Sequence, residues 1–193
     1  MIRIATETDL PAIRAIYAPF VTDTTNTFEY DVPTEEEFLE RFRNIIERFP
    51  WLVWEENCQI LGYAYASLPF TRAAYAWSAE PSIYVAPAAQ GKGIGRKLYL
   101  ALEELLKLLG YRMLFALITG ENTGSVAFHA RLGYTHAGEM KTAGYKFGRW
   151  CSVFWMEKQL QIVENPMDFP TLWSAIRQDD QKIYDILSSL TLS

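Results

Sequence analysis

A short stretch, QGKGIGRK at residues 90–97, combines three glycines with three basic side chains between two apolar segments. Glycine lets backbone N–H groups approach a ligand without interference from a Cβ atom. If a helix begins here, its first amides have no partner within the helix, and its dipole adds about half a positive charge. Lys92, Arg96 and Lys97 add full charges. Such a turn predicts a site for a pyrophosphate.

The spacing of the glycines excludes two nucleotide-binding motifs. The phosphate loop of NTPases requires GxxxxGK[ST], and that string is absent from the chain. The dinucleotide fingerprint GxGxxG needs its third glycine at position 96, which is Arg96. The pattern present is Q-x-x-G-x-G, from Gln90 to Gly95. The alternative without a ligand is an ordinary strand-to-helix turn whose lysines and arginine are solvated.

The flanking segments support a strand, a turn and a helix in that order. PSIYVAP precedes the glycines, and apolar residues then recur at helical spacing until Gly110. Strands are predicted at 2–5, 51–55, 59–67, 74–86 and 111–118, and a closing hairpin is predicted to turn near 148–150. Further helices are predicted to begin near Thr8 or Asp9, at the capping box Thr34/Glu37 and at Asn122. Residues 21–33 are predicted as loop.

This order of elements predicts the fold class. Strands alternate with helices in the second half of the chain, which implies at least one parallel strand pair joined by a crossover helix. The class is therefore α/β, in the broader sense α+β. Pro81 lies inside the strand predicted at 74–86, so that strand must be at an edge or bulged there.

Four separated motifs resemble known acetyltransferases. YVAPAAQGKGIGRKLYLALEELLKLLGY resembles the acetyl-CoA motif of the GNAT N-acetyltransferase superfamily. AYAWSAEPSIYV, TGENTGSVAFHARLGY and AGYKFGRW resemble the phosphinothricin and methionine sulfoximine acetyltransferase family, and TFEYDVPT resembles its early loop. The resemblance covers residues 1–160 and implies the GNAT fold. That fold is a mixed central sheet of about six to seven strands with a splayed parallel pair, here roughly 76–85 and 113–118, and helices on both faces.

The resemblance also implies which residues bind acetyl-CoA. The backbone of Ile83, Tyr84 and Val85 is expected along the pantetheine arm. Asn122 is expected at the pantetheine or the acyl end, although Asn is equally a favoured helix N-cap. The pyrophosphate is expected on Gln90, Gly91, Lys92, Gly93, Ile94, Gly95 and Arg96.

The implied reaction moves an acetyl group from a thioester to an amine, and an ammonium must first lose a proton to a base. The resemblance assigns this role to Glu80, whose alternative is a solvent-facing strand carboxylate. Many superfamily members place a tyrosine where this chain has His129, to give a proton to the departing thiolate. His129 can donate, or it can be a helix residue that bonds a carbonyl.

The acceptor site is expected from three segments. Arg72 offers a planar fork for a carboxylate or phosphinate and Tyr75 a hydroxyl, unless both belong to a surface loop. The remaining candidates are Phe28, Glu29, Lys146 and Phe147. Lys146, together with Arg149, can alternatively serve a dimer interface.

The function predicted is an N-acetyltransferase that moves acetyl directly from acetyl-CoA to a small amino-acid-like amine of the phosphinothricin or methionine sulfoximine type. The alternatives are a GNAT enzyme for a larger amine, such as a protein N-terminus or a polyamine, and a non-catalytic acyl-CoA-binding module. The Arg72/Tyr75 pair favours a small anionic substrate, and retention of Glu80 argues against the binding module.

Composition and charge limit the partners and the cellular compartment that we expect for this protein. A net charge of −5 offers no general attraction to nucleic acid. Cys58 and Cys151 form no metal-ligand cluster with histidines, so no metal is expected, and so few cysteines favour a reducing compartment, although one disulfide stays possible. The start MIRIATETDL lacks the apolar region of a signal peptide, and no apolar run is long enough for a membrane span. A cytoplasmic protein is expected.

The character of the chain changes after Leu160. QIVENPMDFP is predicted as a linker, and apolar residues then recur at helical spacings over 172–190, as one helix or two short ones. We therefore divide the chain into a GNAT domain, 1–160, and a C-terminal extension, 161–193, which the resemblance does not cover. An amphipathic tail must cover either its own domain or a partner subunit. Together with the high aromatic content, this tail favours a homodimer.

Overall fold

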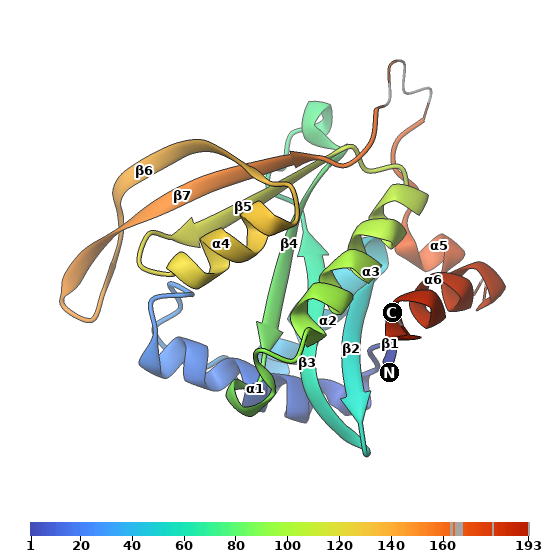
Figure 1. Ribbon diagram of the computed structural model, residues 1–193, viewed down its shortest axis with the longest axis horizontal. Helices are drawn as coiled ribbons and strands as arrows, with labels where there is room; N and C mark the ends of the chain where they lie inside the picture. Colours follow the sequence, from blue (N-terminus) through green and yellow to red (C-terminus); the bar gives the residue numbers. More distant parts are fainter. Residues whose placement is uncertain (163, 165–167, 179, 193) are drawn as a thin grey trace.

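The fold is built on one mixed sheet of seven strands in the order β1-β2-β3-β4-β5-β7-β6. The computed structural model describes residues 1–162, 164, 168–178 and 180–192 (Figure 1). The sheet, its parallel pair and the helices on both of its faces confirm the predicted α/β (α+β) class with the GNAT arrangement. The strands are β1 (Ile2–Ile4), β2 (Trp51–Glu56), β3 (Gln59–Ser67), β4 (Ser78–Val85), β5 (Met113–Thr119), β6 (Thr135–Lys146) and β7 (Arg149–Gln159).

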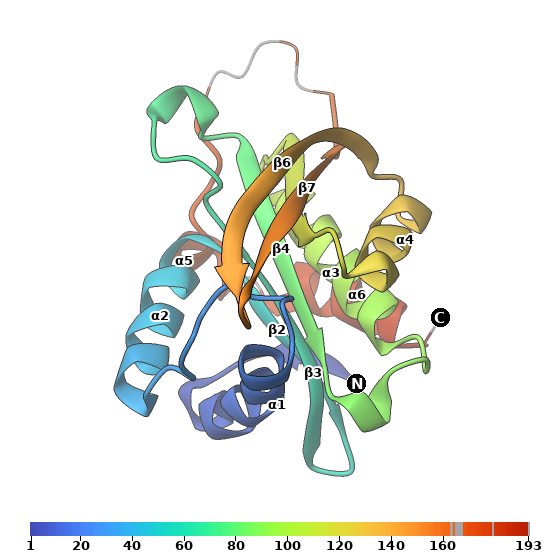
Figure 2. The same cartoon turned by 90° about the vertical axis from the view of Figure 1, so that its left-hand side faces the viewer.

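Two helical layers enclose the sheet (Figure 2). The alternation of apolar side chains along β2 decides the layers: Trp51 and Val53 join the core beneath α1 and α2, whereas Leu52 joins the core beneath α3. The helices are α1 (Leu10–Asp23), α2 (Glu35–Arg48), α3 (Ile94–Leu108), α4 (Thr123–Arg131), α5 (Trp173–Ile176) and α6 (Asp180–Leu192), with short 3-10 turns at Glu7–Asp9, Ala73–Tyr75 and Pro87–Ala89.

The helix signals in the sequence are partly confirmed. The predicted capping box of Thr34 and Glu37 starts α2, with both reciprocal hydrogen bonds formed. At α1 the predicted start is confirmed, with Asp9 at the N-cap position, but the Asp9 side chain makes no cap there and instead closes a capping box with Thr6 on the preceding 3-10 turn. α1 also runs on to Asp23, through three residues predicted as loop.

β4 and β5 form the parallel pair, and they separate almost at once. Their ladder contains two residue pairs, Ser78 with Met113 and Ala79 with Leu114. From Glu80 onward β4 has β3 as its partner strand, in regular antiparallel register. The strand predicted from residue 74 therefore begins at Ser78, and Pro81 lies where the strand is locally an edge and no bulge is needed. The opened V is the feature that the family resemblance implies.

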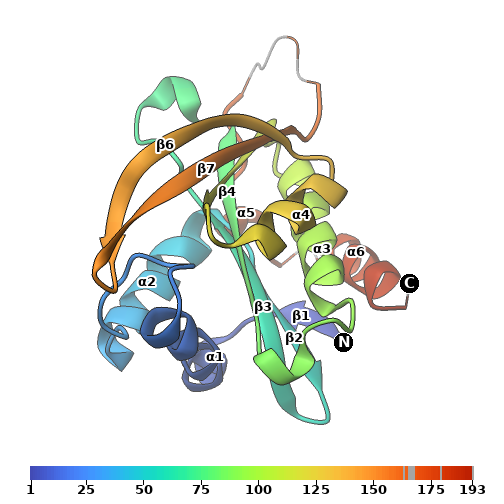
Figure 3. The same ribbon diagram turned by 60° about the vertical axis from the view of Figure 1, so that its left-hand side comes forward.

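The closing hairpin, β6 with β7, is long and curves across the molecule until its tip reaches the loop after α1 (Figure 3). Two register shifts, at His136/Gly138 and Met140/Gly144, account for the bend. The turn lies at residues 147–148, slightly before the predicted position. Near the tip, the Nζ atom of Lys146 donates to the carbonyls of Val21 and Thr27, at 2.7 and 2.8 Å.

The C-terminal extension covers its own domain, which decides between the two alternatives left by the sequence. Its described residues form two helices, and Trp173, Ile183 and Leu187 are buried in the same core as the inner face of α3. The predicted linker at 161–170 falls partly on residues 163 and 165–167, which lie outside the described residues. Within the described part of the chain, no helix is long and apolar enough to cross a membrane.

Candidate active site

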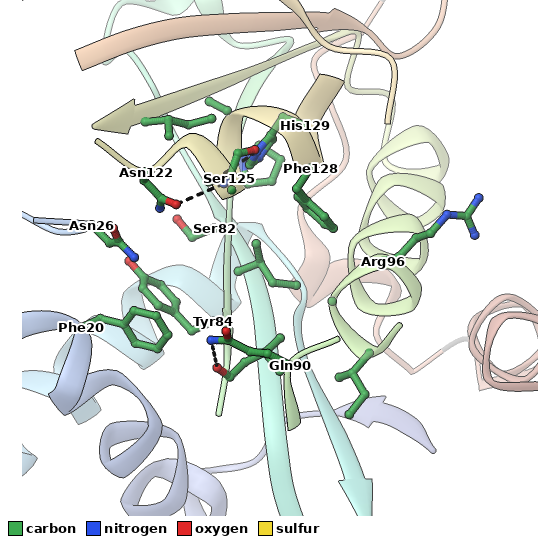
Figure 4. A pocket seen from close by; sticks show the side chains of 18 of the residues that line it. Phe20, Asn26, Ser82, Tyr84, Gln90, Arg96, Asn122, Ser125, Phe128 and His129 are labelled. Atoms are coloured by element: carbon green, nitrogen blue, oxygen red, sulfur yellow. Dashed lines mark hydrogen bonds between the residues drawn. The ribbon is translucent and has the colours of Figure 1, made fainter. Parts of the chain in front are cut away.

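A cavity of about 580 Å³ occupies the opening between β4 and β5 (Figure 4). It brings together most of the residues predicted from the sequence, from three separate segments of the chain. Both catalytic candidates line it, as do ten of the eleven coenzyme candidates: Ile83, Tyr84, Val85, Gln90, Gly91, Gly93, Ile94, Gly95, Arg96 and Asn122, joined by Glu80 and His129.

The glycine turn presents open backbone to this cavity. Gly91 and Gly93 have φ angles of +76° and +80°, which residues other than glycine rarely adopt. A Cβ atom built on either would meet nothing within 4 Å, so the space above them is free. Gly93 is the N-cap of α3 and makes no side-chain cap, so the first amides of the helix are left for a ligand. The turn therefore fits a diphosphate.

The charges around the turn are distributed differently from the prediction. Lys92 is exposed and does not line the cavity. Arg96 lines it with its stem, while its guanidinium extends away from the other labelled side chains (Figure 4). Lys97 was predicted to add charge to the pyrophosphate site, but its Nζ atom donates to the carbonyl of Thr191 at 3.2 Å. An anion at this turn would therefore meet mainly backbone donors and the helix dipole, and fewer charged side chains than the sequence suggested.

Two amide side chains complete this wall of the cavity. Gln90 folds back and donates from Nε2 to the carbonyl of Val85 at 3.2 Å, which ties the turn to the end of β4. Asn122 is the N-cap of α4, its Oδ1 accepting from the Ser125 amide at 3.1 Å. The cap uses only the oxygen of Asn122, so its NH2 group still has donors for a ligand in the cavity.

Glu80 lies at the point where β4 leaves β5. Its side chain is half-buried, and burial raises its pKa from 4.5 to about 7. No neighbouring charge contributes to this shift, which is caused by desolvation alone. A carboxylate with such a pKa is balanced between its charged and neutral forms near neutral pH, as a general base requires.

His129 is buried on α4, 4% exposed. Its Nδ1 atom lies 2.8 Å from the carbonyl oxygen of Ser125, one turn earlier in the helix. A carbonyl can only accept, so Nδ1 carries the proton and Nε2 of the neutral ring is an acceptor. Burial lowers the pKa of His129, which further opposes a protonated donor. This geometry favours the carbonyl-bonding alternative over donation to a thiolate.

None of the six acceptor-site candidates, all within the described part of the chain, lines this cavity. Glu29 is paired with Arg41 at 2.5 Å. Lys146 is 1% exposed and bonded to two carbonyls, so it is a buried structural contact. Phe28 packs its ring on the backbone of Gly144; Arg72, Tyr75 and Phe147 are exposed.

Other residues that line the cavity were missed. Ser82 follows Glu80 on the same face of β4, which strand alternation could have identified. Phe20 and Asn26 come from α1 and the loop after it, and no local pattern marks them (Figure 4). Leu117 and Phe128 line it from β5 and α4. Apolar residues in a strand and a helix carry no signal in the sequence that separates a cavity lining from core.

Comparison with known proteins agrees with this site. The model of the GNAT acetyltransferase domain matches residues 2–155. The chain belongs to the GNAT acetyltransferase family. It is 39% identical over 161 residues to a phosphinothricin N-acetyltransferase of Alcaligenes faecalis, with 82% of each chain covered. It is 34% identical to an L-methionine sulfoximine/L-methionine sulfone acetyltransferase of Salmonella typhimurium, with 82% of this chain and 94% of the relative covered.

This chain is also similar to a solved structure that contains acetyl-CoA. The phosphinothricin acetyltransferase of Sinorhizobium meliloti in complex with acetyl-CoA superimposes with a TM-score of 0.81 and 36% identity, over 90% of this chain and 97% of the other. The predictions of a GNAT fold and of an acyl-CoA-dependent N-acetyltransferase are thereby confirmed. The family model ends at residue 155, before the C-terminal extension.

Proposed function

We propose that this GNAT enzyme acetylates the amine of a small amino-acid-like substrate directly from acetyl-CoA, with Glu80 as general base. The observation that carries the proposal is a desolvated carboxylate, with a pKa of about 7, in the same cavity as the open glycine turn. Relatives named for phosphinothricin and methionine sulfoximine support the class of acceptor.

Coenzyme binding would use the backbone of this chain. The first amides of α3 bind the diphosphate, and the unpaired edge of β4 at Ile83 to Val85 runs beside the pantetheine arm. Asn122 donates from its NH2 group farther along the arm. Acetyl-CoA supplies the thioester, and the residues of the opened V hold it facing Glu80.

The proton transfers of the proposed reaction begin with Glu80. The acceptor arrives as an ammonium, and the Glu80 carboxylate takes one proton, directly or through a water, to expose the lone pair. The amine nitrogen then bonds to the acetyl carbon while the carbon–sulfur bond breaks, and the departing thiolate takes up the second proton that the nitrogen loses as the amide forms. His129, whose Nδ1 proton is bonded to the carbonyl of Ser125, does not supply the proton that the thiolate takes up.

The acceptor would lie on the face of the sheet that carries Glu80. Phe115, Leu117 and Trp155 share this face through the register of β5 with β7. Phe70 packs against Phe115 and Trp155, with ring centroids 5.7 Å apart in both cases. These rings favour an acceptor with an apolar side chain. Arg72, exposed in the neighbouring loop, supplies a group for the carboxylate of the acceptor.

A homodimer is part of the proposal. Exposed aromatic side chains gather at the tip of the β6–β7 hairpin and on the loop it touches: Tyr30, Tyr145, Phe147 and Trp150 are between 47% and 66% exposed. Rings of this size seldom stay in water when a partner surface can cover them. A cytoplasmic location stays a prediction.

The test is a thiol-release assay with purified protein and acetyl-CoA. Acceptors would include phosphinothricin, methionine sulfoximine, apolar amino acids, a polyamine and a peptide with a free N-terminus. Turnover of the amino acids and their analogues supports the proposal. Turnover confined to the polyamine or peptide would support a larger acceptor, and tight acetyl-CoA binding without turnover would support a binding module.

A further inference from the structure

The C-terminal extension contacts α3, the helix that begins at the glycine turn, at both of its ends. At the carboxyl end, Nε2 of Gln161 donates to the carbonyls of Lys107 and Tyr111, at 3.1 and 2.7 Å. The amide of Thr171 donates to the carbonyl of Leu109 at 2.8 Å. The extension therefore satisfies carbonyl groups at and just beyond the end of α3, which helices usually leave to water.

α6 then runs beside α3, and its last turn lies beside β1 and the first turn of α3 (Figure 1). Ile183 and Leu187 are buried in the same core as Leu98 and Leu102 of α3. Near the end of α6, the hydroxyl of Thr191 accepts from the amide of Ile2 at 3.0 Å and donates to the carbonyl of Leu187 at 2.9 Å. α6 thus protects part of the edge strand β1 as well.

Lys97 joins the extension to the first turn of α3. Its backbone amide closes that turn on the carbonyl of Gly93 at 3.1 Å. Its ammonium donates to the carbonyl of Thr191 and lies 5.7 Å from the centroid of the Trp54 ring. A cation at the carboxyl end of a helix is favoured by the helix dipole, so Lys97 binds α6 as a C-terminal cap.

We propose that the C-terminal extension positions the coenzyme-binding turn by holding α3 at both ends, with Lys97 as the positioning residue at the turn. The inference rests on the coenzyme site of the proposed function, and it assigns a role to a segment beyond the family model. The amides of Ile94 and Gly95 keep their direction toward the cavity because the next turn of the helix is fastened to α6.

The test compares Lys97→Met, which keeps the apolar stem over Trp54, with a deletion of residues 189–193, which removes the Thr191 carbonyl. Lys107→Met is the matched control, a lysine on the same helix paired with Glu104 at the surface. The Kd for acetyl-CoA is measured by calorimetry at several salt concentrations, and kcat is measured with both substrates saturating.

We expect Lys97→Met and the deletion each to weaken acetyl-CoA binding about fivefold, a typical lower value for coupling between sites. The combined variant should bind no more weakly than the deletion alone, since the deletion already removes the Lys97–Thr191 contact. In both variants, kcat at saturation and the salt dependence of the Kd should equal those of the wild type. Lys107→Met should bind acetyl-CoA with the Kd of the wild type. A deletion without effect, additive losses, or a reduced salt dependence in Lys97→Met would instead mean that Lys97 binds phosphate directly, and would overturn the inference.

Hydrogen exchange in the absence of coenzyme keeps the two proposals separate. The amides of residues 94–97 should exchange faster in Lys97→Met than in the wild type and the Lys107→Met control. Unchanged exchange would overturn the positioning role, even if the deletion variant does not fold. Failure of the wild type to bind acetyl-CoA would contradict the proposed function and leave this measurement to decide the role of the extension.

Discussion

Glu80→Gln should lower activity and raise stability, with both effects dependent on pH. Glutamine keeps the shape of the side chain and cannot accept the proton of an ammonium. Loss of a general base is typically worth 10²–10⁴ in rate, so we expect the turnover number to fall by roughly that factor. Affinity for acetyl-CoA should be nearly unchanged, because the coenzyme contacts that we propose are backbone groups elsewhere in the cavity.

The stability effect follows from the pKa. Raising the pKa of a carboxyl from 4.5 to about 7 on folding lowers the free energy of unfolding by roughly 3 kcal/mol at a pH where the carboxyl is charged in both states. We use about 2 kcal/mol, because part of the side chain still reaches solvent. The folded state binds the extra proton between these two pKa values, so the free energy of unfolding of the wild type falls as pH rises through this window. Glutamine does not titrate.

The assay is chemical unfolding of both proteins at pH 5 and pH 8, together with a pH profile of kcat/KM. The stability advantage of Glu80→Gln should grow by about 2 kcal/mol between these pH values. The wild-type rate should rise with pH to a plateau above about 7. Glu56→Gln, at an exposed position on β2, is the control and should change neither. An equal stability difference at both pH values, or a variant that keeps a tenth of the activity, would refute the reasoning.

Three further outcomes are expected. Gly144→Ala places a Cβ atom 2.3 Å from the ring of Phe28, so it should destabilise the protein by about 1–3 kcal/mol in denaturant titrations, and an unchanged stability would contradict that packing. Lys146→Met leaves two carbonyls without their donor and should lower the free energy of unfolding by about 1–3 kcal/mol, with the Kd for acetyl-CoA unchanged in calorimetry; an unchanged stability would contradict the structural role of this contact. His129→Gln should lower kcat less than tenfold, because the ring proton is bonded to Ser125; a loss of a hundredfold or more in stopped-flow or steady-state assays would restore the histidine as proton donor.

The sequence by itself determined the order of elements and the glycine turn at the start of α3. Glycine, helix start and preceding strand lie within one continuous segment, 81–110, so local rules were enough to predict the open amides of α3. The capping box at Thr34 and the parallel pair were predictable for the same reason: each is encoded in neighbouring residues or in the alternation of strands and helices.

Tertiary structure alone decided where the charges point and what the extension covers. Lys97 lies in the basic turn, yet its ammonium binds a carbonyl 94 residues away. Lys146 is buried because a curved hairpin brings it to Val21 and Thr27. Long flexible side chains choose partners by what packs nearby, and no short-range pattern records that. The pKa of Glu80 belongs here too, since its cause is burial, which exists only once both layers have closed on the sheet.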